Sequence, residues 1–452
     1  MAGPRRGRAS PGGETGPPAF RPARRRPVLV PVRGLRARTR TSGAAGVDGQ
    51  SSEPPDTRTT RKGTATDMSE PVRIGVVGLG IRGFWLSHLA RQCAETELVA
   101  MADLREDMRG IAREKFPGAA LYRAGEEMAQ AADVEAVVVA TGDCFHAGNA
   151  REALRNGKPV LVEKPLAQSF EDLIEIAHLR KQTGLPIGAY LELRFNPIYR
   201  RAAEIVASGE IGRVLAGSVI DHVGRDRAQF FARARTRTRE AVVSLVLQKG
   251  VHSLDLLNGF MGASPRRVLH FGGDQPADKH CRDCEERETC PHASSTVGRL
   301  EPVGIEIDHN EDFCVWSEAC DVEDVSLVNI EYDTGVVAAY QEIHFAPHYG
   351  LHVTLYGDRA QLDIDANHDT HEAWIEVTER LTRVHRREQP SEDTGHGSAD
   401  EELLADFAGA VRDGCEPFQG LRSGFESAAI AIGARRSIDA RAPIDLPVLD
   451  EI

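Results

Sequence analysis

The sequence predicts an α/β protein whose N-terminal domain is a doubly wound parallel sheet. Residues 72–77 form a short apolar run rich in Val and Ile, which is the pattern of a parallel strand buried on both faces. Similar runs recur at 98–102, 134–140 and 160–162, and segments compatible with a helix follow the first two, at 105–116 and 147–156. The chain has 452 residues, of which 41% are hydrophobic, so it can form two domains with real cores.

The first strand run leads directly into a glycine-rich loop with the spacing Gly78-x-Gly80-x-x-Gly83. A loop of this kind between a strand and a helix is the dinucleotide-binding fingerprint of the Rossmann fold. We expect Gly78 to permit the tight turn, Gly80 to let the backbone approach a pyrophosphate, and Gly83 to let the helix pack on the strand. The N–H groups of Ile81 and Arg82, at the positive end of the helix, then also face the phosphates. A glycine-rich turn that binds no ligand is the simpler alternative.

An acidic residue, Asp103, follows the second strand run, twenty residues after Gly83. At this position the fingerprint expects a carboxylate that accepts hydrogen bonds from a ribose diol. Because a carboxylate repels a 2′-phosphate, we expect NAD as the cofactor. Arg105 lies two residues further on and could instead pair with that phosphate, which keeps NADP open as the alternative.

Charge is distributed unevenly along the chain. Residues 1–67 hold thirteen Arg and one Lys against five acidic residues, although the net charge of the whole chain is −13. The remainder is therefore strongly acidic, at about −22, which argues against nucleic-acid binding. The first 67 residues also lack apolar periodicity, so we expect a disordered basic extension. We favour Met68, which directly precedes the first strand, as the native start over a basic tail or a transit-like leader.

Three further properties bear on the cellular compartment. No run of about 18 apolar residues occurs, so we expect no membrane span. A signal peptide is not expected either, because Pro31 and Arg33 interrupt the short apolar run at 28–30. The eight Cys are sparse in a long chain without an export signal, which favours a reducing, cytoplasmic setting over a disulfide framework.

Polar residues follow two of the buried strand runs. Thr141 and His146 come after the third run, and Glu163 and Lys164 come after the fourth. Ligands of open α/β sheets lie beyond the carboxyl ends of the strands, so we expect all four residues near the cofactor. The Lys164 ammonium can stabilise charge on a reacting oxygen or join a proton relay, and Glu163 can set its charge state. The simpler alternatives are that His146 only begins a helix and that Lys164 is a solvated surface residue.

These motifs together resemble the Gfo/Idh/MocA family of nicotinamide-dependent sugar and polyol oxidoreductases. The resemblance is carried by GLGIRG at 78–83, ATGDCFHAGNAREALRNGKPVLVEKPLA at 140–167, RFNPIYRRAAEIVASGEIGRV at 194–214 and HGSAD at 396–400. It implies an NAD-binding Rossmann domain at 68–193 and a C-terminal domain at 194–452 for substrate binding and oligomerisation. It also implies that the second domain contains a large, mostly antiparallel open sheet. That sheet often forms the subunit interface in this family, so we expect a homodimer or homotetramer.

The segment 248–255 carries the candidate catalytic residues of the second domain. His252 can act as a general base that takes a hydroxyl proton, because imidazole has an unperturbed pKa near 6.5. Asp255 lies on the same helix face and can orient it. A core histidine with a structural acceptor is the simpler alternative, and the family resemblance favours the catalytic role. The resemblance also implies that Asn196, in the turn that opens the second domain, lies near the nicotinamide.

One position departs from the family pattern. Many family members carry an acidic residue four positions before this histidine, where this chain has Gln248, which cannot accept a proton. A proton relay would then depend on Lys164 and His252 alone, or Lys249 would substitute for the missing acid.

A polar segment of the second domain contains three closely spaced cysteines, Cys281, Cys284 and Cys290, and Cys314 follows. Thiolates at this spacing suit a tetrahedral zinc ion, which would stabilise a loop with little core. A subset of the family has a similar Cys-rich loop, and by that resemblance we expect Cys314 to be the fourth ligand. Unpaired loop cysteines are an equal alternative.

The leading functional hypothesis is an NAD(P)-dependent dehydrogenase that acts on a CH–OH group of a sugar, polyol or related alcohol. A second hypothesis is glycoside cleavage by transient oxidation, which predicts product formation without net NADH. A third is a non-catalytic NAD-binding regulator, which predicts cofactor binding without turnover. The expected partners are a small sugar-like substrate and further copies of the chain, with no nucleic acid and no membrane.

Overall fold

The computed structural model describes residues 70–224, 229–233, 235–273, 281–290, 293, 297–308, 313–315, 320–389 and 397–452. The expected basic extension at 1–67 and the candidate start at Met68 lie outside the described residues. Within the described ranges, no helix has the length and apolar character needed to span a membrane.

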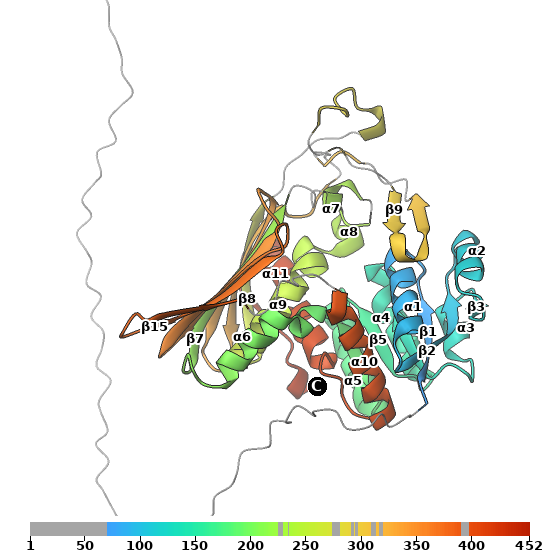
Figure 1. The fold of residues 1–452 in the computed structure, drawn as a ribbon, viewed down its shortest axis with the longest axis horizontal. Helices are drawn as coiled ribbons and strands as arrows, with labels where there is room; N and C mark the ends of the chain where they lie inside the picture. Colours follow the sequence, from blue (N-terminus) through green and yellow to red (C-terminus); the bar gives the residue numbers. More distant parts are fainter. Residues whose placement is uncertain are drawn as a thin grey trace, which may run out of the picture. The chain divides into compact units, whose positions relative to one another are not determined.

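Six short strands form the sheet of the first domain (Figure 1). They are β1 (Val72–Val77), β2 (Thr96–Ala102), β3 (Ala120–Tyr122), β4 (Ala136–Val139), β5 (Val160–Glu163) and β6 (Ile187–Tyr190). Their order is β3-β2-β1-β4-β5-β6 and every pairing is parallel, so the predicted doubly wound sheet is confirmed. The order reverses between β1 and β4, and ligands of such sheets bind at this switch point.

Alternate residues of the central strands face two different helix layers. In β4, Val137 and Val139 pack with α4 and α5, whereas Ala136 and Val138 pack with α1. The strands therefore read as continuous apolar runs, because each is buried on both faces. The helices of this domain are α1 (Ile81–Gln92), α2 (Glu106–Lys115), α3 (Gly125–Ala129), α4 (His146–Arg155) and α5 (Phe170–Thr183).

The ends of α5 show how local sequence sets a helix boundary. The Oγ atom of Ser169 accepts the N–H of Asp172 at 3.1 Å and so caps the first turn. The helix stops at Gly184, whose φ of 71° lies in the left-handed region that favours glycine. The chain then enters β6, which lies at the edge of the sheet.

The second domain contains a nine-stranded sheet in which only β7 and β12 pair in parallel. Its order is β16-β15-β14-β13-β7-β12-β11-β8-β17, so the predicted large, mostly antiparallel sheet is confirmed. The strands are β7 (Val214–Gly224), β8 (Pro265–Gly273), β11 (Val325–Tyr332), β12 (Val337–Ala346), β13 (Gly350–Gly357), β14 (Ala360–Asn367), β15 (Glu372–Glu379), β16 (His385–Glu388) and β17 (Ile444–Asp445).

Helices cover one face of this sheet. Along β11 and β12, exposed and buried positions alternate, as expected when one face is packed and the other is open. The buried face packs against α9 (Val251–Met261) and α11 (Leu421–Ala440) (Figure 1). The shorter helices nearby are α6 (Pro197–Ala207), α7 (Gln229–Ala232), α8 (Arg239–Val242), the 3-10 turns η1 (Asp143–Phe145) and η2 (Glu192–Phe195), and the π-helical turn η4 (Val246–Gly250).

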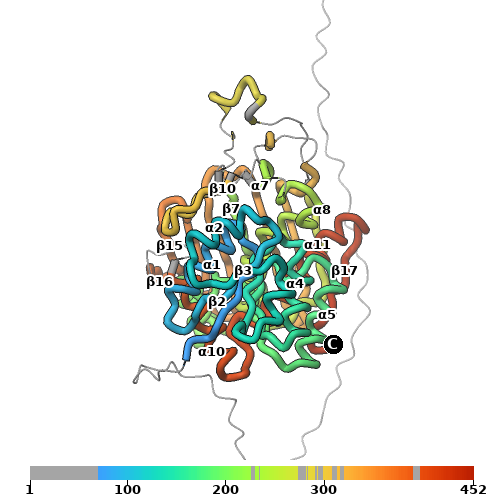
Figure 2. The backbone as a smooth tube through the Cα atoms, turned by 90° about the vertical axis from the view of Figure 1, so that its right-hand side faces the viewer, coloured from blue at the N-terminus to red at the C-terminus, as the bar shows by residue number. Residues whose placement is uncertain are grey.

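Two segments from the second half of the chain return to the first sheet. Leu403 and Phe407 of α10 (Gly397–Asp413) pack in one cluster with β1, β4 and β5, and Figures 1 and 2 both place α10 beside this domain. The hairpin of β9 (Val297–Leu300) and β10 (Ile305–Asp308) packs in another cluster with the start of α1. The division expected at residue 193 thus separates the two sheets but not their cores.

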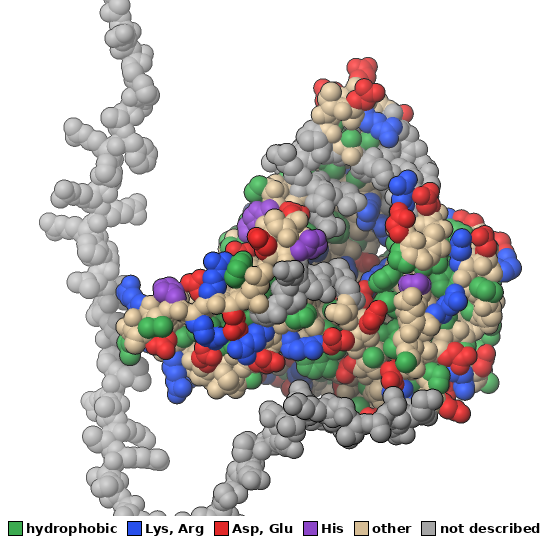
Figure 3. All heavy atoms as spheres, viewed as in Figure 1, with side chains coloured by type: hydrophobic (Ala, Val, Ile, Leu, Met, Phe, Trp, Pro, Cys, Tyr) green, Lys and Arg blue, Asp and Glu red, His purple; other side chains and the backbone are tan. Residues whose placement is uncertain are grey.

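On the face seen in Figure 3, the coloured Lys and Arg side chains are interspersed with Asp and Glu.

Candidate active site

The glycine loop joins β1 to α1, and each glycine has a distinct environment. Gly78 has a φ of 92°, and a Cβ added there would lie 2.6 Å from the backbone of Thr141 at the end of β4. A Cβ on Gly83 would lie 1.8 Å from the Gly78 carbonyl oxygen, so the helix approaches the loop too closely for a side chain. At Gly80, by contrast, an added Cβ would have no described atom within 4 Å. The loop is therefore tight on its inner side and open at Gly80.

The N-terminus of α1 has features that suit an anion. The helix begins at Ile81, no side chain caps it, and its first turn contains no acidic residue. The first N–H groups of a helix lack intrahelical partners and carry the positive end of the helix dipole. The N–H groups of Ile81, Arg82 and Gly83 could therefore hold the phosphates of a dinucleotide.

Asp103 lies beside this loop. Its Oδ2 atom accepts the N–H of Leu79 at 2.7 Å, and its Oδ1 atom accepts the N–H of Arg105 at 2.8 Å. The Arg105 side chain turns away to Asp107, with Nε 3.2 Å from Oδ1. The carboxylate is therefore held at the loop, whereas the guanidinium that could have paired with a 2′-phosphate has another partner.

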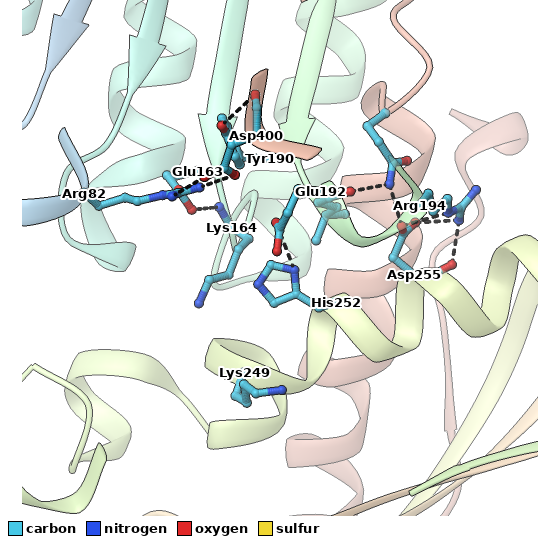
Figure 4. A network of polar contacts seen from close by, with 12 residues as sticks. Arg82, Glu163, Lys164, Tyr190, Glu192, Arg194, Lys249, His252, Asp255 and Asp400 are labelled. Atoms are coloured by element: carbon cyan, nitrogen blue, oxygen red, sulfur yellow. Dashed lines mark hydrogen bonds and ion pairs between the residues drawn. The ribbon is translucent and has the colours of Figure 1, made fainter. Parts of the chain in front are cut away.

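The side chain of Arg82 links three parts of the chain. Its guanidinium pairs with Glu163 at the end of β5 and with Asp400 of α10, the latter at 3.0 and 3.1 Å (Figure 4). The other oxygen of Glu163 accepts the backbone N–H of Lys164 at 2.9 Å. Glu163 therefore pairs with Arg82 and with the backbone, and its negative charge also favours the charged form of the Lys164 amine, as expected. Asp400 had not been expected at the site.

His146 and Asn196 were expected to contact the cofactor, but both are 1% exposed and support the backbone. The His146 ring bonds the carbonyl oxygens of Pro165 at 2.8 Å and Thr141 at 3.0 Å, so both ring nitrogens are used. The Asn196 side chain accepts the N–H of Ile198 at 3.2 Å and caps α6. His146 thus ties the end of β4 to the turn after β5, where the Lys164–Pro165 peptide is cis. These contacts give both residues a structural role, and their contact with the cofactor stays a prediction.

Lys164 lies at the end of β5 and reaches across to the second domain. Its Nζ atom donates to the backbone carbonyl of Gln248 at 2.5 Å. Gln248 lies in the π-helical turn that precedes α9, and such turns expose backbone groups that a regular helix would use. Burial lowers the pKa of Lys164, while Asp143, Glu163 and Glu192 act in the opposite direction.

His252 lies next to Lys164 in Figure 4, and its partner is Glu192. The Nδ1 atom of His252 is 3.5 Å from Oε2 of Glu192, whose side chain is 1% exposed. Only Leu191 separates Glu192 from the end of β6, so Glu192 lies at the carboxyl end of a parallel strand, as Lys164 does. That position is the signal by which Glu192 could have been identified from the sequence.

Asp255 was expected to orient His252, and the structure corrects this assignment. Its Oδ2 atom accepts Nε of Arg194 at 2.8 Å and Nε2 of Gln419, also at 2.8 Å. The guanidinium satisfies both oxygens of a carboxylate that is 1% exposed, which an imidazole on the same helix could not do. Asp255 therefore anchors the crossing between the two domains.

Lys249 also has a fixed partner. Its Nζ atom donates to Oδ2 of Asp221 at 2.7 Å, and Ser253 donates to the same oxygen at 2.8 Å. Burial opposes the charge of Lys249, but Asp221, Tyr349 and Glu342 together outweigh it and raise the pKa of Lys249 above its usual value. A lysine that stays protonated cannot replace the acid missing at Gln248.

The cysteine segment gives the expected zinc site no support. Cys281 is buried and its Sγ atom lies 3.9 Å from the carbonyl oxygen of Phe313, while Cys284, Cys290 and Cys314 are half-buried. All four are free thiols. Among the described residues, no three His, Cys, Asp or Glu side chains converge so that they could hold a metal ion. Spacing in the sequence does not ensure that side chains point toward one centre.

Comparison with known proteins agrees with this architecture. The model of the GFO_IDH_MocA oxidoreductase family, NAD-binding Rossmann fold, matches residues 72–190, and that of its C-terminal alpha/beta domain matches residues 203–446. The putative oxidoreductase YteT of Bacillus subtilis is 23% identical over 395 residues, which are 78% of this chain and 92% of that protein. An inositol 2-dehydrogenase of Rubrobacter xylanophilus is 35% identical over 146 residues, 32% of this chain and less than half, 42%, of that protein.

Solved structures show the same fold. A levoglucosan dehydrogenase in complex with NADH and levoglucosan has a TM-score of 0.67 and 15% identity, and covers 84% of this chain and 100% of its own. An oxidoreductase domain protein from Kribbella flavida has a TM-score of 0.68 and 18% identity, with the same coverage. The two family models together match most of the chain and cover both sheets. The chain therefore belongs to the Gfo/Idh/MocA family of oxidoreductases.

Proposed function

We propose that this protein is an NAD-dependent dehydrogenase that oxidises a CH–OH group of a sugar, polyol or related alcohol. One observation supports the proposal above all. Lys164, at the end of β5, lies close to His252 of α9, at the edge of the parallel sheet that also carries the glycine loop (Figure 4). Inositol 2-dehydrogenases and a levoglucosan dehydrogenase are among the proteins that the chain resembles, which supports this substrate class.

The two residues have complementary chemistry. His252 takes the hydroxyl proton as general base, and the buried Glu192 carboxylate stabilises the imidazolium that results. The Lys164 ammonium donates to the substrate oxygen and stabilises the negative charge that develops there. NAD⁺, when bound, accepts the hydride from the same carbon. The Gln248 carbonyl holds the amine in place, because a carbonyl can accept a hydrogen bond but cannot take its proton.

The cofactor preference follows from the residues beside the glycine loop. The Asp103 carboxylate is fixed by two backbone N–H groups, and the Arg105 side chain pairs with Asp107. A fixed carboxylate accepts the hydroxyls of an adenosine ribose and repels a 2′-phosphate. We therefore expect a higher kcat/KM with NAD than with NADP, and a strong preference for NADP would contradict this assignment.

The Gly80→Ala substitution separates cofactor binding from folding. In the free protein the new methyl group meets no described atom within 4 Å, and the extended φ of −74° and ψ of −176° suit alanine. We expect an unchanged Tm but an affinity for NAD at least about tenfold lower, because the methyl group occupies space that a pyrophosphate needs. Thermal unfolding and calorimetric titration with NAD measure the two effects.

The matched control is Gly110→Ala in α2, where an added Cβ is equally free of neighbours but lies away from the loop. It should leave the affinity for NAD unchanged. Equal NAD affinity in Gly80→Ala and wild type would show that the dinucleotide does not bind at this loop.

A substrate screen tests the activity directly. Purified protein is incubated with NAD or NADP and a panel of sugars, polyols and inositols, while the absorbance of reduced nicotinamide and the products are both followed. Net NADH with a matching ketone or aldehyde supports the dehydrogenase. Cleavage of a glycoside without net NADH would point to transient oxidation instead, and cofactor binding without any turnover would point to a regulator.

We further propose that copies of the chain associate as a homodimer or homotetramer through the open face of the nine-stranded sheet. Several large apolar side chains are exposed on the outward positions of its strands, including Phe271 at 58%, Val325 at 48% and Val337 at 53%. Apolar patches of this kind mark interaction surfaces. Light scattering should give a mass of two or four chains, and replacing Phe271 and Val337 by Ser should lower it. A monomeric wild type would refute this.

A further inference from the structure

The proposed function requires the Lys164 amine to be protonated, but its surroundings disfavour the charged form. Burial lowers the pKa of its amine, and the neighbouring Lys249 lowers it further. Its hydrogen-bond acceptor is the Gln248 carbonyl, a neutral group. The Gln248 side chain is an amide, and its Oε1 atom is buried with no hydrogen-bond partner in the described part of the chain. A nearby carboxylate must therefore supply the compensating negative charge.

Three carboxylates favour the charged form of the Lys164 amine, and two of them have other partners. Those three are Asp143, Glu163 and Glu192. Glu163 pairs with Arg82 and accepts a backbone N–H, and Glu192 faces His252. Asp143 remains, and its Oδ2 atom has no hydrogen-bond partner in the described part of the chain; besides Lys164, the cations that favour its charge are His146 and Arg235.

Sheet register brings Asp143 to the same edge as Lys164. β4 and β5 are adjacent and parallel, with Val139 opposite Val162, so the residues that follow each strand emerge side by side. Asp143 begins the short η1 turn after β4, and Lys164 directly follows β5. The Oδ2 atom of Asp143 is buried and has no hydrogen-bond partner among the described residues. An oxygen that has lost water without gaining a donor is poised to accept one.

The charges around Asp143 are consistent with such a role. Burial raises the pKa of the Asp143 carboxyl, and Glu163 raises it further. His146, Lys164 and Arg235 act in the opposite direction and favour the carboxylate. The carboxylate and the Lys164 ammonium thus stabilise each other, because both residues are half-buried and each favours the charged form of the other.

We propose that Asp143 is a positioning residue that keeps the Lys164 amine protonated and available to the substrate oxygen. The proposal rests on the proposed function, since it assigns Lys164 the task of stabilising charge on that oxygen. Asp143 acts through Lys164 and does not contact the reacting atoms. It supplies the negative charge that an acid at position 248 would otherwise provide.

The test uses Asp143→Asn, which keeps the shape of the side chain and removes its charge. Without the carboxylate, the pKa of Lys164 falls, so the ammonium is lost at lower pH. The basic limb of the kcat/KM profile should therefore move to lower pH, while the acidic limb stays in place. Asp143→Glu should restore the wild-type profile.

The matched control is Asp133→Asn, because Asp133 is exposed and lies at the opposite end of β4. The pH profile of this variant should equal that of the wild type.

A second measurement does not depend on turnover. Amine-reactive reagents modify only neutral amines, so the labelling of Lys164, followed by mass spectrometry across a pH series in the free protein, reports its protonation. Asp143→Asn should label at lower pH than wild type. Coincident labelling curves would overturn the proposal, even if the variant turned over more slowly. If no alcohol is oxidised by the wild type, the proposed function fails, and the labelling series still decides whether Asp143 controls Lys164.

Discussion

Replacement of His252 by alanine is expected to lower kcat by a factor of about 10² or more, the range for loss of a general base. The imidazole lies next to the Lys164 amine and 3.5 Å from the Glu192 carboxylate, so it is placed to take a proton and to be stabilised once it has done so. A factor of 10² corresponds to about 2.7 kcal/mol of transition-state stabilisation. Steady-state kinetics on the substrate found in the screen measure it.

The affinity for NAD should change little in His252→Ala, because the imidazole belongs to the second domain and not to the glycine loop. His178→Ala, which removes an exposed histidine from α5, is the matched control and should retain full kcat. Glu192→Gln should give a smaller loss than His252→Ala, since it removes only the charge that stabilises the imidazolium. Unchanged turnover in His252→Ala, with an unchanged Tm, would remove His252 from the chemistry.

The parallel sheet and its glycine loop could be predicted because their signals are local. Gly78 and Gly83 have to be glycine for reasons that involve only neighbouring backbone, namely a positive φ and a contact too close for a Cβ. The strands read as apolar runs because each contacts helices on both faces. Lys164 could be placed near the cofactor because the carboxyl ends of parallel strands share one edge.

Partner choice in the site could not be predicted, because it depends on contacts between distant segments. Asp255 is three positions from His252 on one helix, which made that pairing reasonable. The structure brings Arg194 and Gln419 to the same carboxylate, and a bidentate guanidinium is the stronger partner. In the same way, nothing near Arg82 in the sequence indicated that Asp400 would pair with it.

The second sheet was expected from family resemblance and the zinc site mainly from cysteine spacing, and their outcomes differ. A sheet of nine strands is specified by many alternating positions, so a resemblance along the whole chain is enough to predict it. A metal site depends on the direction of three or four side chains at once. In the described part of the chain, Cys281, Cys284 and Cys290 do not converge with other ligands on one centre, so the zinc expectation gains no support.

Replacement of Lys164 by methionine is expected to lower kcat by a factor of about 10² to 10³, the range for removal of a donor that stabilises a developing oxyanion. Methionine keeps the length and apolar stem of the side chain and removes the ammonium that now bonds the Gln248 carbonyl. Lys164→Arg should not restore activity, because a planar guanidinium does not reproduce the compact ammonium. Steady-state kinetics and NAD titration together measure the effect.

The substitutions at Gly80 and Lys164 together distinguish an effect on NAD binding from an effect on the chemical step. Gly80→Ala is expected to weaken NAD and leave the chemistry of the bound complex intact, whereas Lys164→Met should bind NAD with near wild-type affinity and fail in turnover. Lys181→Met on α5 is the matched control, because Lys181 is exposed and donates to the backbone oxygen of Ile452, away from the site. Near wild-type kcat in Lys164→Met would leave His252 as the sole group acting on the proton. In that case the negative charge of Asp143 near Lys164 would have no part in the chemistry.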